Sequence, residues 1–175
     1  MGSRAHPLEL ERVRSDEKVA EVAALADEIW NEHFPSIIGQ AQVDYMLDKF
    51  QSERAIAEQI AGDYEYYLIE DEAVPVGYIA LVPEQDKSSA LLSKIYVQKR
   101  LRGRGLGKAA LEFAEQLCRE SNIATLWLTV NKHNSRSIKW YQRVGFTNVG
   151  PIVMDIGGGF IMDDFKFEKP VPPTS

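Results

Sequence analysis

The chain has 175 residues, of which 45% are hydrophobic and 26% are charged, and its formal net charge is −6. This length fits one compact domain, which we expect over residues 8–168, with flexible termini at residues 1–7 and 169–175. The single cysteine, Cys118, excludes an intramolecular disulfide and indicates a cytoplasmic protein. The acidic balance argues against nucleic-acid binding, and no apolar run approaches the roughly 20 residues that a membrane span requires.

The N-terminal part of the chain is predicted to be one short strand followed by helices. Residues 8–13 alternate apolar and polar side chains, as strands do. Helical spacing of apolar residues predicts three helices, over residues 16–30, 43–50 and 56–60. Ser15 stands at the N-cap position of the first helix, and Pro35 and Gly39 break the helical pattern after it.

From Tyr64 onward the pattern is that of strands with two intervening helices. Strands are predicted at residues 64–69, 74–82, 90–97, 125–130, 146–155 and 160–167. Helices are predicted at residues 106–121 and 135–144. The third of these strands, the first helix and the fourth strand make a βαβ unit, so we expect an α/β (α+β) fold with a mixed sheet covered by helices.

A glycine-rich turn between a strand and a helix carries the clearest chemical signal. It runs Arg102-Gly103-Arg104-Gly105-Leu106-Gly107 and belongs to a dense basic cluster of Lys94, Lys99, Arg100, Arg102, Arg104 and Lys108. The N–H groups and the dipole at a helix N-terminus attract anions, and glycine lets the main chain approach a phosphate. The turn is therefore predicted to bind a few phosphates, and a surface turn without a ligand is the alternative.

Two other phosphate motifs fit this turn less well. The P-loop needs glycine where Arg102 stands and serine or threonine where Ala109 stands. The dinucleotide fingerprint G-x-G-x-x-A does match from Gly105 to Ala110, but residues 126–132 offer no acidic side chain for a ribose hydroxyl. That fingerprint usually opens its fold, whereas three earlier strands precede this turn, so a nicotinamide oxidoreductase is the weaker alternative.

Two motifs in the right order resemble the GNAT superfamily of N-acetyltransferases. The turn from Arg102 to Gly107 is similar to the R/Q-x-x-G-x-G/A signature of that superfamily. Residues Asn134 to Phe146 are similar to its N-x-x-A-x-x-x-Y-x-x-x-G-F element, with Ser137 in the place of alanine and Tyr141 as the tyrosine. The resemblance covers residues 64–167 and implies a single-domain GNAT-like fold, with a mixed, mostly antiparallel twisted sheet of about seven strands and helices on both faces.

The resemblance also implies an acetyl-CoA-dependent N-acetyltransferase, with acetyl-CoA as cofactor and a general acid at Tyr141. The pantetheine arm would lie along the strand that ends at Val97, and a backbone N–H near Ile95 would polarise the acetyl carbonyl. The residues expected to bind the cofactor are Ile95, Tyr96, Val97, Arg102, Gly103, Arg104, Gly105, Leu106, Gly107, Lys108, Asn134 and Tyr141. Alternatives are a core position for Tyr141, an N-cap for Asn134 and a solvated charge for Lys108.

The sequence does not identify a general base. Several members of the superfamily have a glutamate at positions that align with Leu91 or Thr129, and neither of these residues is a base. The other candidates, each expected to be a surface charge, are Glu28, Glu32, His33, Glu70, Glu72 and Asp155. Proton transfer through ordered water is an alternative. The three histidines and Cys118 lack metal-ligand spacing, so no metal site is predicted. The lack of a Cys–His pair argues against a covalent acetyl-enzyme and favours direct attack of the amine on the thioester in a ternary complex.

The acceptor is predicted to be a small amine or polyamine. Residues 94–97 and 130–134 resemble bacterial acetyltransferases that act on polyamines, and the acidic composition favours a cationic substrate. A protein N-terminus or lysine is the alternative acceptor, and a catalytically silent acyl-CoA-binding regulatory domain is the alternative function. We expect no nucleic-acid or membrane partner. The sequence does not determine the oligomeric state, and a homodimer is one alternative because dimers are common in families of this kind.

Overall fold

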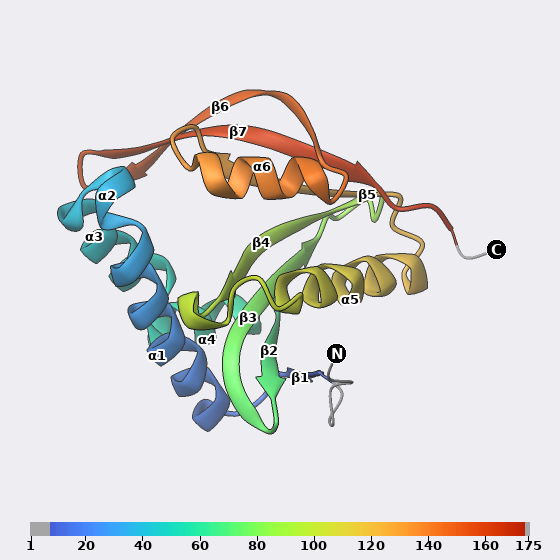
Figure 1. Cartoon of the computed structure of the whole chain (residues 1–175), viewed down its shortest axis with the longest axis horizontal. Helices are drawn as coiled ribbons and strands as arrows, with labels where there is room; N and C mark the ends of the chain where they lie inside the picture. Colours follow the sequence, from blue (N-terminus) through green and yellow to red (C-terminus); the bar gives the residue numbers. More distant parts are fainter. Residues whose placement is uncertain (1–7, 174–175) are drawn as a thin grey trace. The chain divides into compact units, whose positions relative to one another are not determined.

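The computed structural model describes residues 8–173, and its elements follow the predicted order (Figure 1). The helices are α1 (Asp16–His33), α2 (Pro35–Ile38), α3 (Gln40–Phe50), α4 (Glu53–Ala61), α5 (Leu106–Glu120) and α6 (Ser135–Arg143), with a 3-10 helix η1 (Lys99–Leu101). The strands are β1 (Glu9–Arg12), β2 (Glu65–Asp71), β3 (Val74–Pro83), β4 (Ser89–Val97), β5 (Thr125–Asn131), β6 (Thr147–Gly157) and β7 (Phe160–Pro170). The predicted break at Pro35 contains the short helix α2 instead, because proline is well tolerated in the first turn of a helix.

The strands form one seven-stranded sheet in the order β1-β2-β3-β4-β5-β7-β6. The pairs β1–β2, β2–β3, β5–β7 and β6–β7 are antiparallel, whereas β4 and β5 are parallel. The parallel pair is joined through α5, as the predicted βαβ unit requires. The mixed, mostly antiparallel sheet expected from the sequence is confirmed.

The chain forms two compact units. Unit 1 comprises the residues up to Leu81 together with Lys94–Phe113, and unit 2 comprises Val82–Ser93 together with the residues from Ala114 onward. Strand β4 begins in unit 2 and ends in unit 1, and helix α5 begins in unit 1 and ends in unit 2. Between residues 8 and 173, every helix is too short or too polar to cross a membrane.

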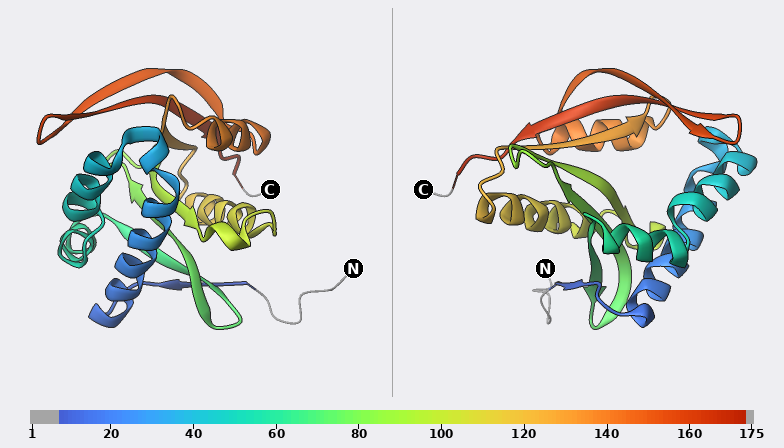
Figure 2. Two further views of the ribbon diagram at one scale, coloured as in Figure 1. Left: turned by 60° about the vertical axis from the view of Figure 1, so that its left-hand side comes forward. Right: turned by 180° about the vertical axis from the view of Figure 1, so that it is seen from behind.

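In unit 1, helices cover both faces of strand β2. Successive strand residues point to opposite faces, and two neighbouring tyrosines show this alternation. The Tyr66 hydroxyl donates to Gln59 of α4, whereas the Tyr67 ring packs edge-on against Phe113 of α5, with 5.0 Å between the ring centroids. Helices α1, α3 and α4 pack against one another beside the first of these faces (Figure 2). The prediction of helices on both faces is thereby confirmed for this unit.

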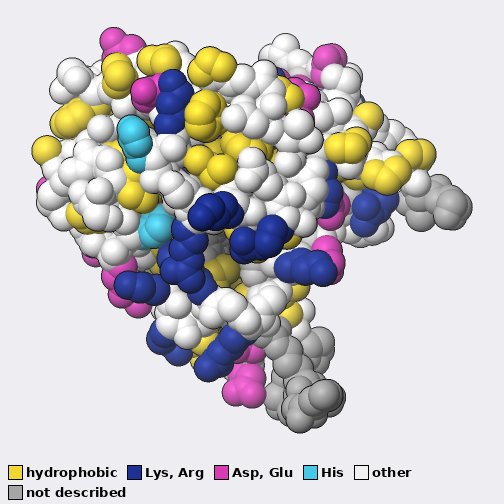
Figure 3. All heavy atoms as spheres, turned by 45° about the horizontal axis from the view of Figure 1, so that its top comes forward, with side chains coloured by type: hydrophobic (Ala, Val, Ile, Leu, Met, Phe, Trp, Pro, Cys, Tyr) yellow, Lys and Arg dark blue, Asp and Glu magenta, His cyan; other side chains and the backbone are white. Residues whose placement is uncertain are grey.

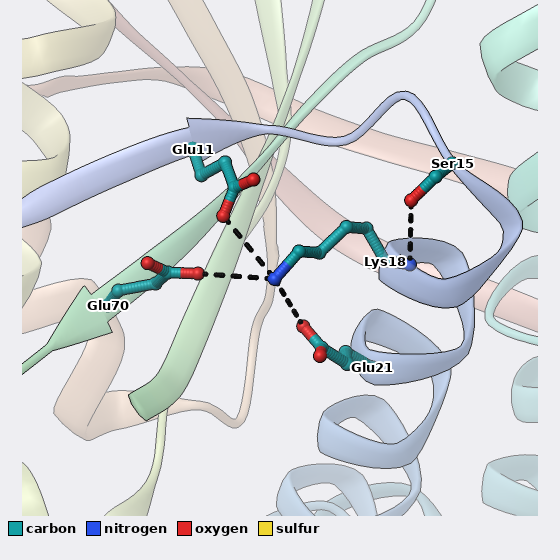
Figure 4. A network of polar contacts seen from close by, with 5 residues as sticks. All are labelled: Glu11, Ser15, Lys18, Glu21 and Glu70. Carbon is teal, nitrogen blue, oxygen red and sulfur yellow. Dashed lines mark hydrogen bonds and ion pairs between the residues drawn. The ribbon is translucent and has the colours of Figure 1, made fainter. Parts of the chain in front are cut away.

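One lysine ties α1 to two strands of unit 1 (Figure 4). Ser15 caps α1 as predicted, because its hydroxyl accepts from the Lys18 N–H at 3.3 Å. The Lys18 Nζ lies 3.4 Å from Glu11 of β1, 3.2 Å from Glu21 of α1 and 3.6 Å from Glu70 of β2. Burial, and then the nearby Glu11 carboxylate, raise the pKa of Glu70. The network thus fixes the start of α1 against β1 and β2.

Strand β3 approaches the end of β4 very closely at Gly77. A Cβ atom on Gly77 would lie 2.3 Å from the Tyr96 carbonyl oxygen and 3.1 Å from the Val97 Cα. Such distances are too short for a side chain, so only glycine permits this spacing of the two backbones. Just beyond the strand, the Gln98 N–H donates to the Val76 carbonyl at 2.9 Å. The last residues of β4 are therefore held closely against β3.

Unit 2 is built around the long antiparallel pair β6–β7. The register of this pair runs from Thr147 opposite Glu168 to Gly157 opposite Phe160, where glycines make the predicted turn. The other edge of β7 pairs with β5 along the whole length of β5. Helix α6 lies beside β6 and β7 in the views of Figures 1 and 2. The connection from β5 through α6 to β6 is thus compact.

Strand β7 extends past the limit at residue 168 that the sequence predicts for the domain. The Lys169 Nζ lies 2.5 Å from the Glu115 Oε1, and the N–H of the buried Val171 donates to the Ala124 carbonyl at 2.8 Å. The prolines near the C-terminus indicate a loose tail, but a proline at the end of a strand does not disrupt the ladder before it. The other expected flexible terminus, residues 1–7, lies outside the described part of the chain.

Candidate active site

The glycine-rich turn joins η1 to α5 in unit 1. Gly103 and Gly105 have φ angles of 83° and 78°, a left-handed conformation that glycine adopts without strain. A Cβ at either position would meet no atom within 4 Å, so the backbone angle rather than crowding requires glycine. Leu101 and Leu106, which are 5% and 1% exposed, anchor the two ends of the turn in the core. The turn between them is therefore held in place and open on its outer side.

The exposed side of this turn suits a phosphate group. Leu106, Gly107 and Lys108 form the first turn of α5, where backbone N–H groups have no acceptor within the helix. Arg104 and Lys108 are exposed and Arg102 is half-buried. Lys and Arg side chains gather on the face of the molecule in Figure 3. Free N–H groups, a helix dipole and flexible cations are together the groups that a diphosphate requires.

The end of β4 places alternate side chains on opposite faces. Tyr96 points toward α1, and its ring centroid lies 5.7 Å from that of Trp30, 6.2 Å from that of Phe34 and 5.4 Å from that of Tyr78. Trp30 and Phe34 are buried, so these aromatic residues of α1 and its C-terminus belong to the core of unit 1. Tyr96, which is half-buried, therefore contributes packing through its ring.

A pocket of about 600 Å³ lies in unit 1 between α1 and the segment that follows β4. Its lining residues are Glu28, Glu32, Gln98, Lys99 and Arg100. The Gln98 side chain links the two walls, because its Nε2 donates to the Glu28 Oε2 at 2.9 Å and its Oε1 accepts from the Arg100 Nη2 at 3.0 Å. Among the base candidates, Glu28 and Glu32 thus share one pocket, with carboxylates on one wall and cations on the other.

Lys94 does not belong with the exposed basic cluster in which the sequence places it. Its side chain is only 4% exposed, and its Nζ donates to the Phe50 carbonyl at 2.7 Å, to the Gln59 Oε1 at 2.9 Å and to the Tyr66 hydroxyl. Burial lowers the pKa of Lys94 to about 7 and raises that of Tyr66. Residue spacing could not reveal this cluster, because its members come from α3, α4, β2 and β4.

Asn134 and Tyr141, the site residues expected from the second motif, lie in unit 2. Asn134 is buried and is the N-cap residue of α6, as the alternative predicts, although its side chain makes no capping hydrogen bond. Tyr141 lies on α6 with its ring 5.6 Å from that of Phe146 and 6.4 Å from that of Phe167. Burial raises the pKa of Tyr141, so its phenol stays protonated at neutral pH.

The remaining base candidates have structural partners or open surroundings. Glu70 lies in the Lys18 network, and the Asp155 Oδ1 accepts from the Gly157 N–H at 2.8 Å in the turn after β6. Glu72 is exposed in the β2–β3 turn. The sequence does not point to Asp164 of β7, which is 3% exposed and has a pKa raised to about 6 by burial. The sequence could have indicated Asp164 only through its position, because an acidic residue stands there at an inward-facing position of a predicted strand.

The fold and the phosphate-binding turn together define the class of protein. A mixed sheet whose parallel strands are joined through a glycine-rich turn and a helix N-terminus is typical of an enzyme with a phosphorylated cofactor. Among residues 8–173, no three His, Cys, Asp or Glu side chains come together as a metal site would require.

Known proteins identify the family. The profile of the Acetyltransferase (GNAT) family matches residues 23–146. An uncharacterized N-acetyltransferase in the pepI 3' region of Lactobacillus delbrueckii subsp. lactis is 30% identical over 151 residues, 82% of this chain and 87% of that protein. The chain belongs to the acetyltransferase (GNAT) family, so it is an acetyl-CoA-dependent N-acetyltransferase and acetyl-CoA is its cofactor.

Solved structures have the same fold. The PaiA N-acetyltransferase from Thermoplasma acidophilum, in complex with coenzyme A, has a TM-score of 0.76 and 21% identity, covering 94% of this chain and 99% of that one. The ribosomal-protein-S18-alanine N-acetyltransferase from Escherichia coli has a TM-score of 0.71 and 18% identity, covering 97% of each chain. The GNAT-like fold expected from the two motifs is confirmed.

Proposed function

We propose that the enzyme transfers the acetyl group of acetyl-CoA to a primary amine of a small amine or polyamine. The observation that carries this proposal is the pocket of unit 1, where Glu28 and Glu32 of α1 face Lys99 and Arg100. Residues four apart on a helix share one face, so the two carboxylates point to the same side. Within residues 8–173 neither carboxylate forms an ion pair; Glu28 accepts a hydrogen bond from Gln98, and both carboxylates keep a negative charge that attracts an ammonium group.

The chain's own groups would hold the cofactor by its diphosphate and its pantetheine arm. The N–H groups at the start of α5, with Arg102, Arg104 and Lys108, would bind the diphosphate. Main-chain groups of residues 95–97 would bind the arm, and an N–H near Ile95 would polarise the acetyl carbonyl. Removing such an oxyanion donor typically costs about 3 kcal/mol of transition-state stabilisation. Bound acetyl-CoA supplies the activated thioester.

Tyr141 is proposed as the general acid that protonates the leaving thiolate. Its raised pKa keeps the proton on the hydroxyl, and this hydroxyl makes no hydrogen bond to any residue between 8 and 173, so it is not committed to another partner. Asn134 is proposed as a side-chain contact to the cofactor, which agrees with its burial at the start of α6.

Direct attack by the amine is proposed rather than a covalent acetyl-enzyme. Cys118 is fully buried on α5, as its place in the apolar stripe of the helix predicts. A thiol that is fully buried in a helix core is out of reach of a thioester and behaves as an inert packing residue. The amine would therefore react with the thioester while both substrates are bound.

The test is an acetylation screen that follows the release of the coenzyme A thiol. Polyamines, amino acids, aminoglycosides and peptides are offered as acceptors at saturating acetyl-CoA. We expect the highest kcat/KM for a small di- or polyamine. A clear preference for peptides, or no turnover on any amine together with tight acetyl-CoA binding, would contradict the proposal.

A matched pair of variants then locates the acceptor. Glu32→Gln should raise the KM for the preferred amine by on the order of 10-fold and leave the KM for acetyl-CoA unchanged, because one carboxylate of the pocket is lost. Glu112→Gln removes the same charge from an exposed position on α5 and should change neither constant. Equal effects of the two substitutions would argue against this pocket as the amine site.

A further inference from the structure

Lys94 is a buried amine whose hydrogen-bond capacity is filled by three different elements. Its Nζ donates to the carbonyl of Phe50, the last residue of α3, to the Gln59 side chain of α4 and to the Tyr66 hydroxyl of β2. Its own backbone belongs to β4, directly before Ile95. An ammonium group has three protons, and three acceptors surround it. Such complete coordination specifies one position for the side chain.

The partners of Lys94 are also bound to one another. The Gln59 Nε2 donates to the Phe50 carbonyl at 3.1 Å, and the Tyr66 hydroxyl donates to the Gln59 Oε1. Helices α3 and α4 and strand β2 would therefore stay connected without the lysine. Among the hydrogen bonds of this cluster, those that reach β4 all come from the Lys94 Nζ.

We propose that Lys94 is a positioning residue for acetyl transfer: it fixes the Lys94–Ile95 peptide of β4 against the α3–α4 corner, so that the Ile95 N–H keeps the direction needed to polarise the acetyl carbonyl. The inference rests on the proposed function of Ile95. Close approach of Gly77 to the Tyr96 carbonyl holds the Tyr96–Val97 peptide, two peptides further along β4, from the β3 side. Lys94 and Gly77 thus restrain the same short segment from two directions.

The surroundings allow this contact to persist when Lys94 loses its proton. The tyrosines that face the Nζ are Tyr66 of β2 and Tyr64, which precedes β2; their ring centroids lie 4.9 Å and 5.9 Å away, and no described carboxylate forms an ion pair with the Nζ. A neutral amine keeps two N–H donors for Phe50 and Gln59, and its lone pair accepts from the Tyr66 hydroxyl once that proton turns from the Gln59 Oε1 to the amine. The position of the strand is therefore maintained in both charge states.

The test measures the polarisation of the acetyl carbonyl, which needs no acceptor. Acetyl-CoA labelled with carbon-13 at the carbonyl is bound to the full chain, and its stretching band is recorded by isotope-edited infrared spectroscopy. In the wild type, hydrogen bonding should shift the band to lower wavenumber than in free acetyl-CoA. Lys94→Met, which keeps the side-chain length, should lose most of this shift while its affinity for acetyl-CoA, measured by calorimetry, stays close to that of the wild type.

Two further variants complete the experiment. Lys49→Met removes an exposed lysine from the same end of α3 and should leave both the shift and the affinity unchanged. If Lys94→Met does not fold, Tyr66→Phe takes its place and should lose part of the shift. An unchanged shift in the folded variant would overturn the role of Lys94 alone, whereas a wild type that binds acetyl-CoA without any shift would overturn the proposed role of Ile95 as well.

Kinetics provide a second readout once an acceptor is known. Lys94→Met should lower kcat by on the order of 10-fold through misdirection of the carbonyl donor, with little change in the KM for acetyl-CoA. A rise in that KM with unchanged kcat would indicate a role in binding and would contradict a positioning role.

Discussion

Replacing Lys94 by methionine should remove a large pH dependence from the stability of the protein. The pKa of Lys94 is lowered from 10.5 to about 7 because burial disfavours the charged amine. In the unfolded chain the amine recovers its ordinary value. Between the two values the unfolded state therefore binds a proton that the folded state does not bind, and the free energy of unfolding depends on pH in this window.

The sign and size of the effect follow from these two values. Raising the pH above about 7 releases the proton that favours the unfolded state, so the wild type gains about 1.4 kcal/mol of stability per pH unit. The gain ends near the unfolded value and amounts to about 5 kcal/mol over the whole window. Below about 7 both states are protonated, and the full cost of burying the charge is present. Methionine carries no proton and has no such slope.

The measurement is urea unfolding of the wild type and of Lys94→Met at several values between about pH 7.5 and pH 9.5, followed by tryptophan fluorescence. Higher pH is avoided because buried tyrosines such as Tyr66 and Tyr78, whose pKa values are raised, begin to contribute in the opposite direction. Subtracting the two curves cancels all groups that the proteins share. Equal slopes for the two proteins would refute the reasoning, because Lys94 would then keep an ordinary pKa.

Three further predictions concern single residues. Gly105→Asp should raise the KM for acetyl-CoA by at least about 10-fold, because it strains a left-handed backbone and places a negative charge beside the diphosphate; an unchanged KM in steady-state kinetics would contradict the assigned turn. Tyr141→Phe should lower kcat by on the order of 100-fold with an unchanged urea midpoint, since its hydroxyl has no protein partner among the described residues; full activity would exclude a general acid here. Asp164 has a pKa raised from 3.8 to about 6, so the folded state holds its proton more tightly and the protein should lose about 3 kcal/mol as the pH rises through that interval. Asp164→Asn should abolish this fall in urea titrations, and a fall that persists in the variant would assign it to another group.

Much of the fold could be predicted because the local patterns agree with the final structure. Apolar residues spaced for a helix or a strand predict each long element, since burial of one face selects the period. The Ser15 cap and the glycine-rich turn also depend on neighbouring residues alone. The pattern does not reveal the short helix α2, because proline usually signals a break, or the end of β7, because prolines are typical of a loose tail.

The candidate site was predictable only in part. The turn from Arg102 to Lys108 depends on backbone angles and a helix start, which glycines and a helical pattern reveal. The pocket beside it depends on a contact between Gln98 and Glu28, which are 70 residues apart in the sequence. No periodicity links two positions so far apart, so the pocket cannot be predicted without knowing how α1 packs against the segment that follows β4.

The sequence by itself determined the order of elements, the phosphate-binding turn and the resemblance that led to the family, because each of these depends on residues close together in the chain. The tertiary structure decided the charge states and the hydrogen-bond partners of individual side chains. Lys94 lies 44 residues from Phe50 and 28 from Tyr66, and only packing around it turns an ordinary lysine of a basic cluster into a buried amine with a lowered pKa. Burial depends on all the neighbours that surround a group in space, and a linear pattern does not contain that information.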